Sequence, residues 1–357
     1  MDDPALDHQV DRFGHGTDLN RCSDRGSIPA PDSRSTAVLP VRLREMELVD
    51  LTAWAPREGG SLSYRVETRF GLDSLPEGAS FGQVSAVGTD PEGNVFAFQR
   101  GPRTDPIVVF DPQGRFLRSW GAGIGIAHGL RLDPDGAVWI TDVGSHCVLK
   151  FNRAGRLLRT LGTPGRAGAD EATFDRPTDV TFGANGVVYV SDGYGNSRIV
   201  RFDRNGRFIS AWGRPGSEPG EFATPHALAT DREGRVYVSD RANERIQIFD
   251  QDGTYLSSWT HLGATQGIDI TAGDEVWVMT FRSLDEILRY DSMPGRLMRL
   301  DLASGRVLGS LDAPGHSVHR SAAGDVFVGS LTGNVIRLVA AGTSETPAMA
   351  LDEDRPG

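Results

Sequence analysis

The chain repeats one 15-residue unit six times, and this repeat constrains its fold more than any other feature. The six copies align without a gap, and their first residues lie 43, 50, 48, 40 and 50 positions apart. The copies begin at Ser85, His128, Thr178, His226, Gln266 and His316. A repeat period of this length is typical of proteins built from similar modules that pack against their neighbours.

Each repeat has the sequence pattern of antiparallel strands. In the copy at 128–142, an alternating run leads into Asp-Pro-Asp-Gly, and a run rich in Val, Trp and Ile follows. Two further alternating runs around a second glycine turn complete each period, as at 198–212. Apolar alternation bounded by such turns predicts hairpins, and four strands per repeat predict a propeller blade. We therefore predict an all-β, six-bladed β-propeller without amphipathic helices.

The sixth repeat has only three clear strand patterns, the last of them at 334–340. Before the first repeat, the segment LSYRVETRF at 62–70 alternates like a strand. We predict that this N-terminal strand completes the last blade and closes the ring, which removes the open edges of the sheets. The propeller domain then spans 46–340. The polar segment 1–45 and the tail 341–357 are predicted to be disordered or loosely attached.

Charge and cysteine content exclude several classes of protein. The formal net charge of −11 argues against a nucleic-acid partner, because such proteins present a basic surface. The two cysteines, Cys22 and Cys147, allow at most one disulfide, so this is no disulfide scaffold. There is no apolar run long enough for a membrane span and no secretory signal pattern. We expect a cytoplasmic monomer, since a closed ring needs no partner for its edges.

Histidine stands at the first repeat position in three alternate copies, as His128, His226 and His316. The first strand of each propeller blade lines the central channel, so these side chains are predicted to lie about 120° apart at one height. Three neutral imidazoles with one open face suit a catalytic Zn²⁺ ion, although nickel, cobalt or iron also fit. The alternative is three ordinary histidines. That alternative requires three of only eight histidines to share one repeat position by chance.

Two arginines and a tyrosine follow the second strand of their repeats. Arg100 and Arg241 belong to opposite repeats, and two guanidinium groups at the channel mouth can clamp a carboxylate. The alternative is that both pair with aspartates at the surface. Tyr194 lies between two glycines, and a tyrosine beside a metal and an arginine can act as a base. The alternative is a tyrosine that caps an apolar edge.

Other polar residues are predicted to be structural. His146, His261 and His319 lie off the ring position and are interpreted as structural or exposed. Aspartate recurs at the last position of three repeats, which predicts hydrogen bonds to turn amides rather than catalysis. These aspartates are Asp142, Asp192 and Asp240.

The motifs resemble the NHL-repeat propeller family and, within it, the peptidyl-α-hydroxyglycine α-amidating lyases. The resemblance covers about residues 71–338. It is most specific at HGLRLDPDGAVWITDV, at RPTDVTF with YVSDGYGNSRIV, at PHALATD with VSDRANERIQIF, and at GHSVH. It implies a zinc-dependent lyase that cleaves an N-acyl-α-hydroxyglycine to a primary amide and glyoxylate.

The resemblance also implies roles for individual residues. It places the zinc ligands at His128, His226 and His316, the functional arginines at Arg100 and Arg241, and the functional tyrosine at Tyr194. It further implies a structural calcium ion, held by backbone carbonyls matching Val87 and Leu130 and by an aspartate after the third histidine. This chain has Ser317 at that last position, which speaks against calcium.

Three other functions remain open from the sequence. A small substrate such as ureidoglycolate would undergo the same type of cleavage. A non-catalytic NHL scaffold would bind protein or RNA, but the acidic charge disfavours RNA, and a scaffold has no need of the histidine ring. A lactonase-type hydrolase is another enzyme with six blades, but such enzymes usually bind their metal through Glu, Asn and Asp.

Overall fold

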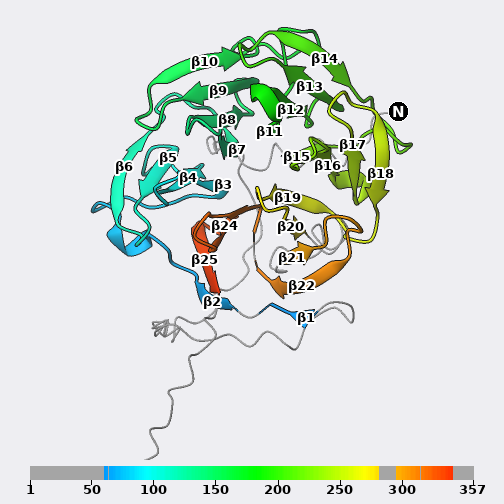
Figure 1. Cartoon of the computed structure of the whole chain (residues 1–357). Helices are drawn as coiled ribbons and strands as arrows, with labels where there is room; N and C mark the ends of the chain where they lie inside the picture. The colour runs from blue at the N-terminus through cyan, green and yellow to red at the C-terminus, as the bar shows by residue number, and fades with distance from the viewer. Residues whose placement is uncertain (1–59, 63, 281–294, 314, 341–357) are drawn as a thin grey trace, which may run out of the picture. The chain divides into compact units, whose positions relative to one another are not determined.

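The described part of the protein is a closed ring of six β-sheets (Figure 1). The structure is a computed structural model, and it describes residues 60–62, 64–280, 295–313 and 315–340. In these ranges the only helical elements are short 3-10 turns, namely η2 (Leu72–Ser74), η3 (Ala184–Gly186) and η4 (Arg241–Asn243). The all-β, six-bladed propeller is therefore confirmed. The predicted terminal segments 1–45 and 341–357, together with Cys22, lie outside the described residues.

The first three blades each contain four consecutive antiparallel strands. Blade one is formed by β3 (Val84–Thr89), β4 (Val95–Gln99), β5 (Ile107–Phe110) and β6 (Phe116–Trp120). Blade two is formed by β7 (Ala127–Leu132), β8 (Val138–Asp142), β9 (Cys147–Phe151) and β10 (Leu157–Leu161). Blade three is formed by β11 (Asp179–Phe182), β12 (Val188–Asp192), β13 (Arg198–Phe202) and β14 (Phe208–Trp212).

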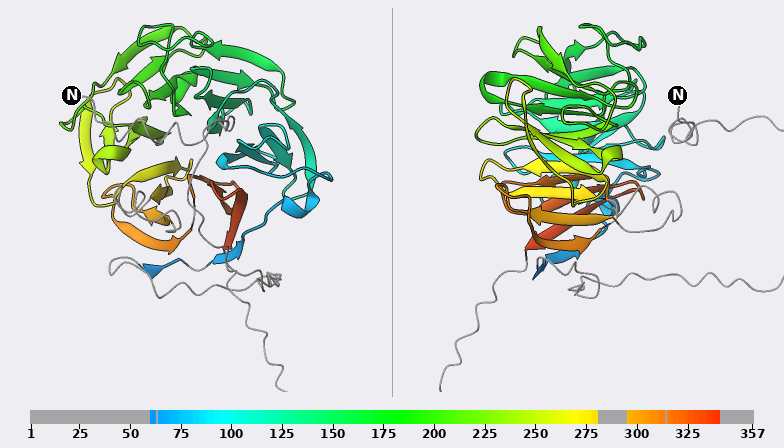
Figure 2. Two further views of the ribbon diagram at one scale, coloured as in Figure 1. Left: turned by 180° about the vertical axis from the view of Figure 1, so that it is seen from behind. Right: turned by 90° about the vertical axis from the view of Figure 1, so that its right-hand side faces the viewer.

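The other three blades complete the ring, which Figure 2 shows from behind and from the side. Blade four is formed by β15 (Pro225–Thr230), β16 (Val236–Asp240), β17 (Arg245–Phe249) and β18 (Tyr255–Trp259). Blade five is formed by β19 (Thr265–Ile270), β20 (Val276–Thr280), β21 (Arg296–Leu300) and β22 (Val307–Asp312). Blade six is formed by β23 (Ser317–Arg320), β24 (Val326–Ser330), β25 (Asn334–Ala340) and β2 (Tyr64–Glu67).

The ring closes through the N-terminal strand β2. Its residues pair antiparallel with β25, from Tyr64 opposite Ala340 to Glu67 opposite Arg337. The strand predicted at 62–70 therefore does complete the last blade. A further strand, β1 (Gly60–Ser61), pairs parallel with the outer edge of β22, and the sequence did not predict it. With only two residues, β1 has no alternation by which it could be recognised.

The apolar core lies between the blades. The second strand of each blade is buried on both faces, as in β8 and β16, whereas the fourth strands are partly exposed. Each of the six apolar clusters combines residues from two neighbouring blades; one of them packs Phe96 and Phe98 of blade one against Leu130 and Ile140 of blade two. Because every blade is packed on two sides, the first strands are fixed around the axis.

A repeated contact between tryptophan and glycine also links neighbouring blades. Gly253, in the last turn of blade four, has a φ of +93°, and a Cβ atom there would lie 2.6 Å from the ring of Trp212 in blade three. The same arrangement joins Gly155 to Trp120 and Gly305 to Trp259. These glycines are therefore required both by their backbone conformation and by the close approach of the indole.

We expect Gly253→Ala to lower the free energy of unfolding by about 2 kcal/mol or more, because it combines a left-handed backbone with a clash. Gly234→Ala is the matched control, because Gly234 has a φ of +84° and no atom within 4 Å of the Cβ position. The free energy of unfolding of the control should fall by only about 1 kcal/mol, the cost of the left-handed backbone without a clash. Urea denaturation measures both variants. An equal loss of unfolding free energy in both variants would show that the close approach of Trp212 does not require glycine at position 253.

Candidate metal centre

Three histidines meet on the axis of the ring. His128 lies in β7, His226 lies in β15, and His316 directly precedes β23. All three are buried, and their ring centroids lie 4.8, 4.9 and 5.0 Å apart. Their candidate ligand atoms all lie within 4.8 Å of one another, so the three residues could hold a metal ion. The structure thus brings together the three histidines that the repeat alignment selected.

The hydrogen bonds of the three rings follow one pattern. The Nδ1 atom of each histidine donates to the carbonyl oxygen of the first repeat residue in the next blade. These bonds join His128 to Thr178 at 2.6 Å, His226 to Gln266 at 2.7 Å and His316 to Ser85 at 2.7 Å. A carbonyl oxygen can only accept, so the ring proton is on Nδ1 and Nε2 keeps its lone pair. This is the tautomer that a metal ligand needs, and the carbonyl fixes the ring orientation.

The electrostatic surroundings keep the three imidazoles neutral. Burial lowers the pKa of His128 and that of His226 well below the usual value, and the neighbouring positive groups lower both further. Burial also lowers the pKa of His316 to about 3, with the charge of Arg100 as the next cause. At neutral pH, the centre therefore presents three uncharged nitrogen donors, the form in which histidine binds transition metals.

Tyr194 contacts two of the three histidines. It follows β12, and its hydroxyl lies 2.8 Å from Nε2 of His128 and 3.1 Å from Nε2 of His226. The phenol has one proton, whereas both Nε2 atoms are acceptors, so it can donate to only one of them at a time. At least one Nε2 lone pair is therefore left without a proton donor from Tyr194, and a metal cation could bind such a lone pair. The predicted tyrosine is therefore placed at the histidine centre rather than at an apolar edge.

The two predicted arginines also lie at this end of the channel. The Arg100 side chain donates to the carbonyl of Ala127 (2.7 Å) and to the amide oxygen of Gln83 (3.3 Å). The Arg241 guanidinium lies 5.4 Å from the centre of the Tyr194 ring. Both positive charges lower the pKa of His128 and that of His316, so both act on the same centre.

Neither arginine behaves like a surface residue paired with aspartate. Across the described residues, no ion pair is formed by Arg100 or Arg241. The Nε atom of Arg241 is buried without a hydrogen-bond partner in that same part of the chain. The alternative of local Asp–Arg pairs therefore finds no support where the structure is described. Free guanidinium donors beside a metal-binding centre can bind an anion.

Sequence reasoning missed Arg176, which holds the backbone of Tyr194. The Arg176 side chain donates to the Tyr194 carbonyl at 3.1 Å, and its own carbonyl accepts from the Tyr194 amide at 3.3 Å. Arg176 has a φ of +59°, an uncommon conformation for a residue other than glycine. His146 accepts from the Arg176 amide at 3.1 Å, so it is structural. No pattern in the sequence marks a left-handed arginine.

The remaining polar predictions have structural roles. Asp142 accepts from the amides of Gly125 and Ile126, while Asp192 and Asp240 each accept from the amide of a preceding loop and from an arginine. Asp142, Asp192 and Asp240 are thus loop anchors, as predicted. His261 contacts the carbonyl of Gly305 at 2.9 Å and lies away from the centre.

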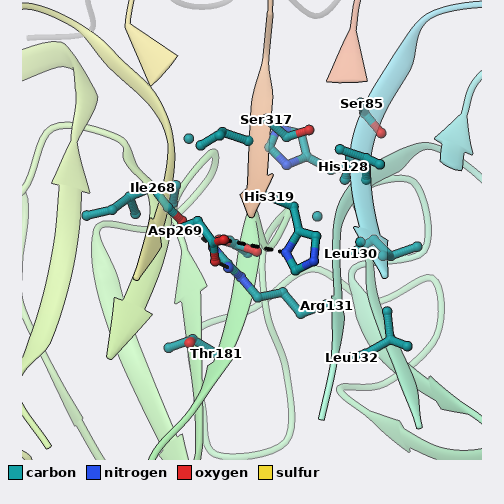
Figure 3. A pocket seen from close by; sticks show the side chains of 18 of the residues that line it. Ser85, His128, Leu130, Arg131, Leu132, Thr181, Ile268, Asp269, Ser317 and His319 are labelled. Atoms are coloured by element: carbon teal, nitrogen blue, oxygen red, sulfur yellow. Dashed lines mark hydrogen bonds and ion pairs between the residues drawn. The ribbon is translucent and has the colours of Figure 1, made fainter. Parts of the chain in front are cut away.

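A cavity of about 450 Å³ continues along the channel on the other side of the histidines (Figure 3). It is lined by the first strands of the blades, down to Asp133 and Ala272 near their far ends. Val87, Leu130 and Ser317, which the sequence linked to calcium, line this cavity. Ser317 contributes a neutral hydroxyl, and its Oγ atom is buried without a partner in the described ranges.

Comparisons with known proteins agree with the fold. A family model described as an NHL repeat matches residues 125–151, and a model described as a 6-bladed beta-propeller matches residues 168–261. The solved structure of a gluconolactonase from Xanthomonas campestris is 16% identical, with a TM-score of 0.56, covering 83% of this chain and 97% of that one. At this identity, the likeness shows the fold alone. The described fold is thus a six-bladed β-propeller, and residues 125–151 within it match an NHL repeat.

Its homologues include both enzymes and a protein named only for its repeats. NHL repeat-containing protein 3 of Mus musculus is 35% identical, over 51% of this chain and 57% of the relative. Peptidylglycine alpha-amidating monooxygenase of Rattus norvegicus is 35% identical, over 53% of this chain and 22% of the relative. A probable peptidyl-alpha-hydroxyglycine alpha-amidating lyase of Caenorhabditis elegans is 32% identical, over 46% of this chain and 54% of the relative. The chain thus covers at most 57% of the length of these relatives.

Within the described residues, no helix is long and apolar enough to cross a membrane.

Proposed function

We propose that this protein is a zinc-dependent carbon–nitrogen lyase that converts an N-acyl-α-hydroxyglycine to a primary amide and glyoxylate. One observation carries the proposal. Three neutral histidine Nε2 atoms, a tyrosine hydroxyl that touches two of them, and two arginines without acidic partners in the described ranges gather at one end of the channel. The names of the amidating-lyase relatives support the same reaction.

His128, His226 and His316 would hold the metal ion. Their donor set fits zinc, because three neutral imidazoles oriented by carbonyl groups leave a fourth position for water or substrate. A bound zinc ion would act as a Lewis acid towards an oxygen of the substrate. Nickel, cobalt and iron also accept three imidazoles, and elemental analysis distinguishes them.

Arg100 and Arg241 would bind the carboxylate of the substrate. Each guanidinium has N–H groups that the described residues leave unused, and the two charges act on the same centre. A carboxylate held by two arginines fixes the α-carbon beside Tyr194. Fixing the reacting group in this way lowers the entropic part of the barrier. In a chain of net charge −11, the two guanidinium groups form a local positive region that can attract a small anionic substrate.

Tyr194 would accept the proton of the substrate hydroxyl as the general base. The electrons of the O–H bond form the aldehyde C=O bond, and the C–N bond breaks. The departing amide nitrogen then takes up a proton, for which Tyr194 is the nearest proposed donor. The products are a primary amide and glyoxylate, so the reaction consumes no water and needs no redox cofactor.

The test is glyoxylate release from two substrates. Zinc-loaded protein is incubated with α-hydroxyhippurate and, separately, with ureidoglycolate, and glyoxylate is measured in both. We expect faster release from α-hydroxyhippurate. Release from ureidoglycolate alone would show that the substrates are small ureido compounds and not N-acyl-α-hydroxyglycines. Release from neither compound would contradict the proposed reaction. In the latter case, a lactone-hydrolysis assay and a search for protein partners test the two remaining alternatives.

Arg176→Ala is expected to lower kcat about 10-fold, which corresponds to about 1.4 kcal/mol in activation free energy. The substitution removes the side-chain hydrogen bond to the Tyr194 carbonyl and leaves the proposed carboxylate and metal ligands in place. KM and metal content should therefore stay close to the wild-type values. Arg176→Lys, which keeps one donor, should recover part of kcat. A rise in KM at constant kcat would instead place Arg176 in substrate binding.

A further inference from the structure

The side chain of Arg131 crosses the channel beyond the histidines and joins four blades. Arg131 lies in β7 of blade two, and its Nη1 atom is 3.1 Å from a carboxylate oxygen of Asp269 in blade five. Its Nη2 atom is 3.2 Å from Asp179 in blade three. The same Nη2 atom donates to the carbonyl oxygens of Leu228 in blade four (2.7 Å) and Ile268 in blade five (2.6 Å).

The network continues into the other two blades. Asp269 accepts from the backbone amide of Arg320 at 2.7 Å and lies 3.5 Å from Nδ1 of His319, both in blade six. Nε2 of His319 contacts the hydroxyl of Thr89 in blade one at 2.8 Å. Figure 3 shows Arg131, Asp269 and His319 together inside the cavity. All six blades therefore contribute to one polar network around a single guanidinium group.

The guanidinium binds a layer of carbonyl groups that the repeat defines. Leu228 and Ile268 are the third residues of their repeats, and Val87 and Leu130 are the third residues of the first two repeats. All four residues thus stand at equivalent positions of their blades, and Val87, Leu130 and Ile268 line the same cavity. Two carbonyls at the repeat position that the resemblance assigns to calcium, in blades four and five, thus already bind a permanently charged cation supplied by the chain itself.

The residues present do not fit a calcium ion. Calcium binds through several oxygens and is favoured by carboxylates. Ser317 brings no negative charge, and the carboxylates of Asp179 and Asp269, which lie beside this position, are already paired with Arg131. A divalent cation would also meet the positive guanidinium in the same cavity, at low effective dielectric.

We infer that Arg131 is a built-in cation that takes the place of a structural Ca²⁺ in this propeller, and that its removal creates a calcium site. Without Arg131, the two carboxylates and the carbonyls of Leu228 and Ile268 face one buried space. This is a set of hard oxygen donors of the kind that Ca²⁺ prefers over smaller cations. Arg131 has no part in the proposed reaction, so the inference stands or falls independently of it.

The first test uses the wild-type protein. Elemental analysis of the purified chain should find no calcium, and a calorimetric titration with CaCl₂ should show no binding. Millimolar Ca²⁺ should leave Tm unchanged. A chelator is avoided, because it would also remove metal from the histidines. One calcium ion per chain, or a Tm that rises with Ca²⁺, would overturn the inference.

The second test uses Arg131→Ser. We expect a lower Tm than that of the wild type, because the buried carboxylates of Asp179 and Asp269 lose the guanidinium that pairs with both. Millimolar Ca²⁺ should raise this Tm by several degrees, and Mg²⁺ should raise it much less. The inference would be contradicted if the folded variant has the same Tm with and without Ca²⁺, or if its Tm equals that of the wild type.

The matched control is Arg131→Lys, which keeps the positive charge but loses the planar guanidinium group with its two Nη donors. It should show a smaller loss of Tm and no response to Ca²⁺. Should the serine variant fail to fold, the wild-type titration and the lysine variant still decide the question. Calcium binding by the lysine variant would show that a fixed positive charge does not exclude the ion.

Discussion

His226→Ala is expected to lose the bound metal and, with it, at least 100-fold in kcat/KM, about 2.7 kcal/mol in transition-state stabilisation. The substitution removes one of the three nitrogen donors, and the two remaining imidazoles are too few ligands for a catalytic zinc site. Elemental analysis of the purified variant measures the first effect, and glyoxylate release measures the second. We expect about one zinc ion per wild-type chain and none in the variant.

The control for this prediction is His261→Ala. His261 is an exposed histidine whose ring is hydrogen-bonded to the carbonyl of Gly305, and it lies outside the centre. This variant should keep its metal and its activity, which would show that the effect belongs to the ring position and not to histidine in general. A His226→Ala variant with full zinc content would remove this histidine from the metal centre.

Tyr194→Phe is expected to keep the metal and lose turnover by roughly 100-fold or more, the range of a missing general base. The substitution removes only the hydroxyl that touches His128 and His226 and leaves all three imidazoles in place. Metal content, Tm and KM should stay close to the wild-type values while kcat falls.

Tyr189→Phe is the matched control for the loss of a phenol. The Tyr189 hydroxyl donates to the carbonyl of Gln251 at 2.9 Å and has no contact with the centre. Its variant should lose a little stability and no turnover. Undiminished turnover in Tyr194→Phe would exclude Tyr194 from the proton transfer. A loss of metal in the same variant would make its role structural.

The sequence predicted the features that the repeat fixes. Strand order follows from alternation and glycine turns, and the place of β2 follows from the missing fourth strand of the sixth repeat. The histidine centre could be predicted because equivalent positions of equivalent blades must lie at equivalent places around the axis. His128, His226 and His316 meet there for that reason.

Features that break the repeat could not be predicted in this way. The side-chain hydrogen bond from Arg176 to the Tyr194 carbonyl depends on how the loop before blade three packs. The path of Arg131 across the channel depends on side-chain rotamers and on partners from 48 and 138 residues along the chain. Such contacts follow from the packed structure and leave no local pattern in the sequence.

The reaction class is tested most directly by analysing the products of α-hydroxyhippurate in ¹⁸O-labelled water. A lyase breaks the bond between nitrogen and the α-carbon without consuming water. We therefore predict benzamide that carries no ¹⁸O, formed in a one-to-one ratio with glyoxylate by the zinc-loaded protein and not by His226→Ala. Benzoate that carries ¹⁸O would show hydrolysis of the amide instead, and would contradict the assignment of this propeller as a carbon–nitrogen lyase.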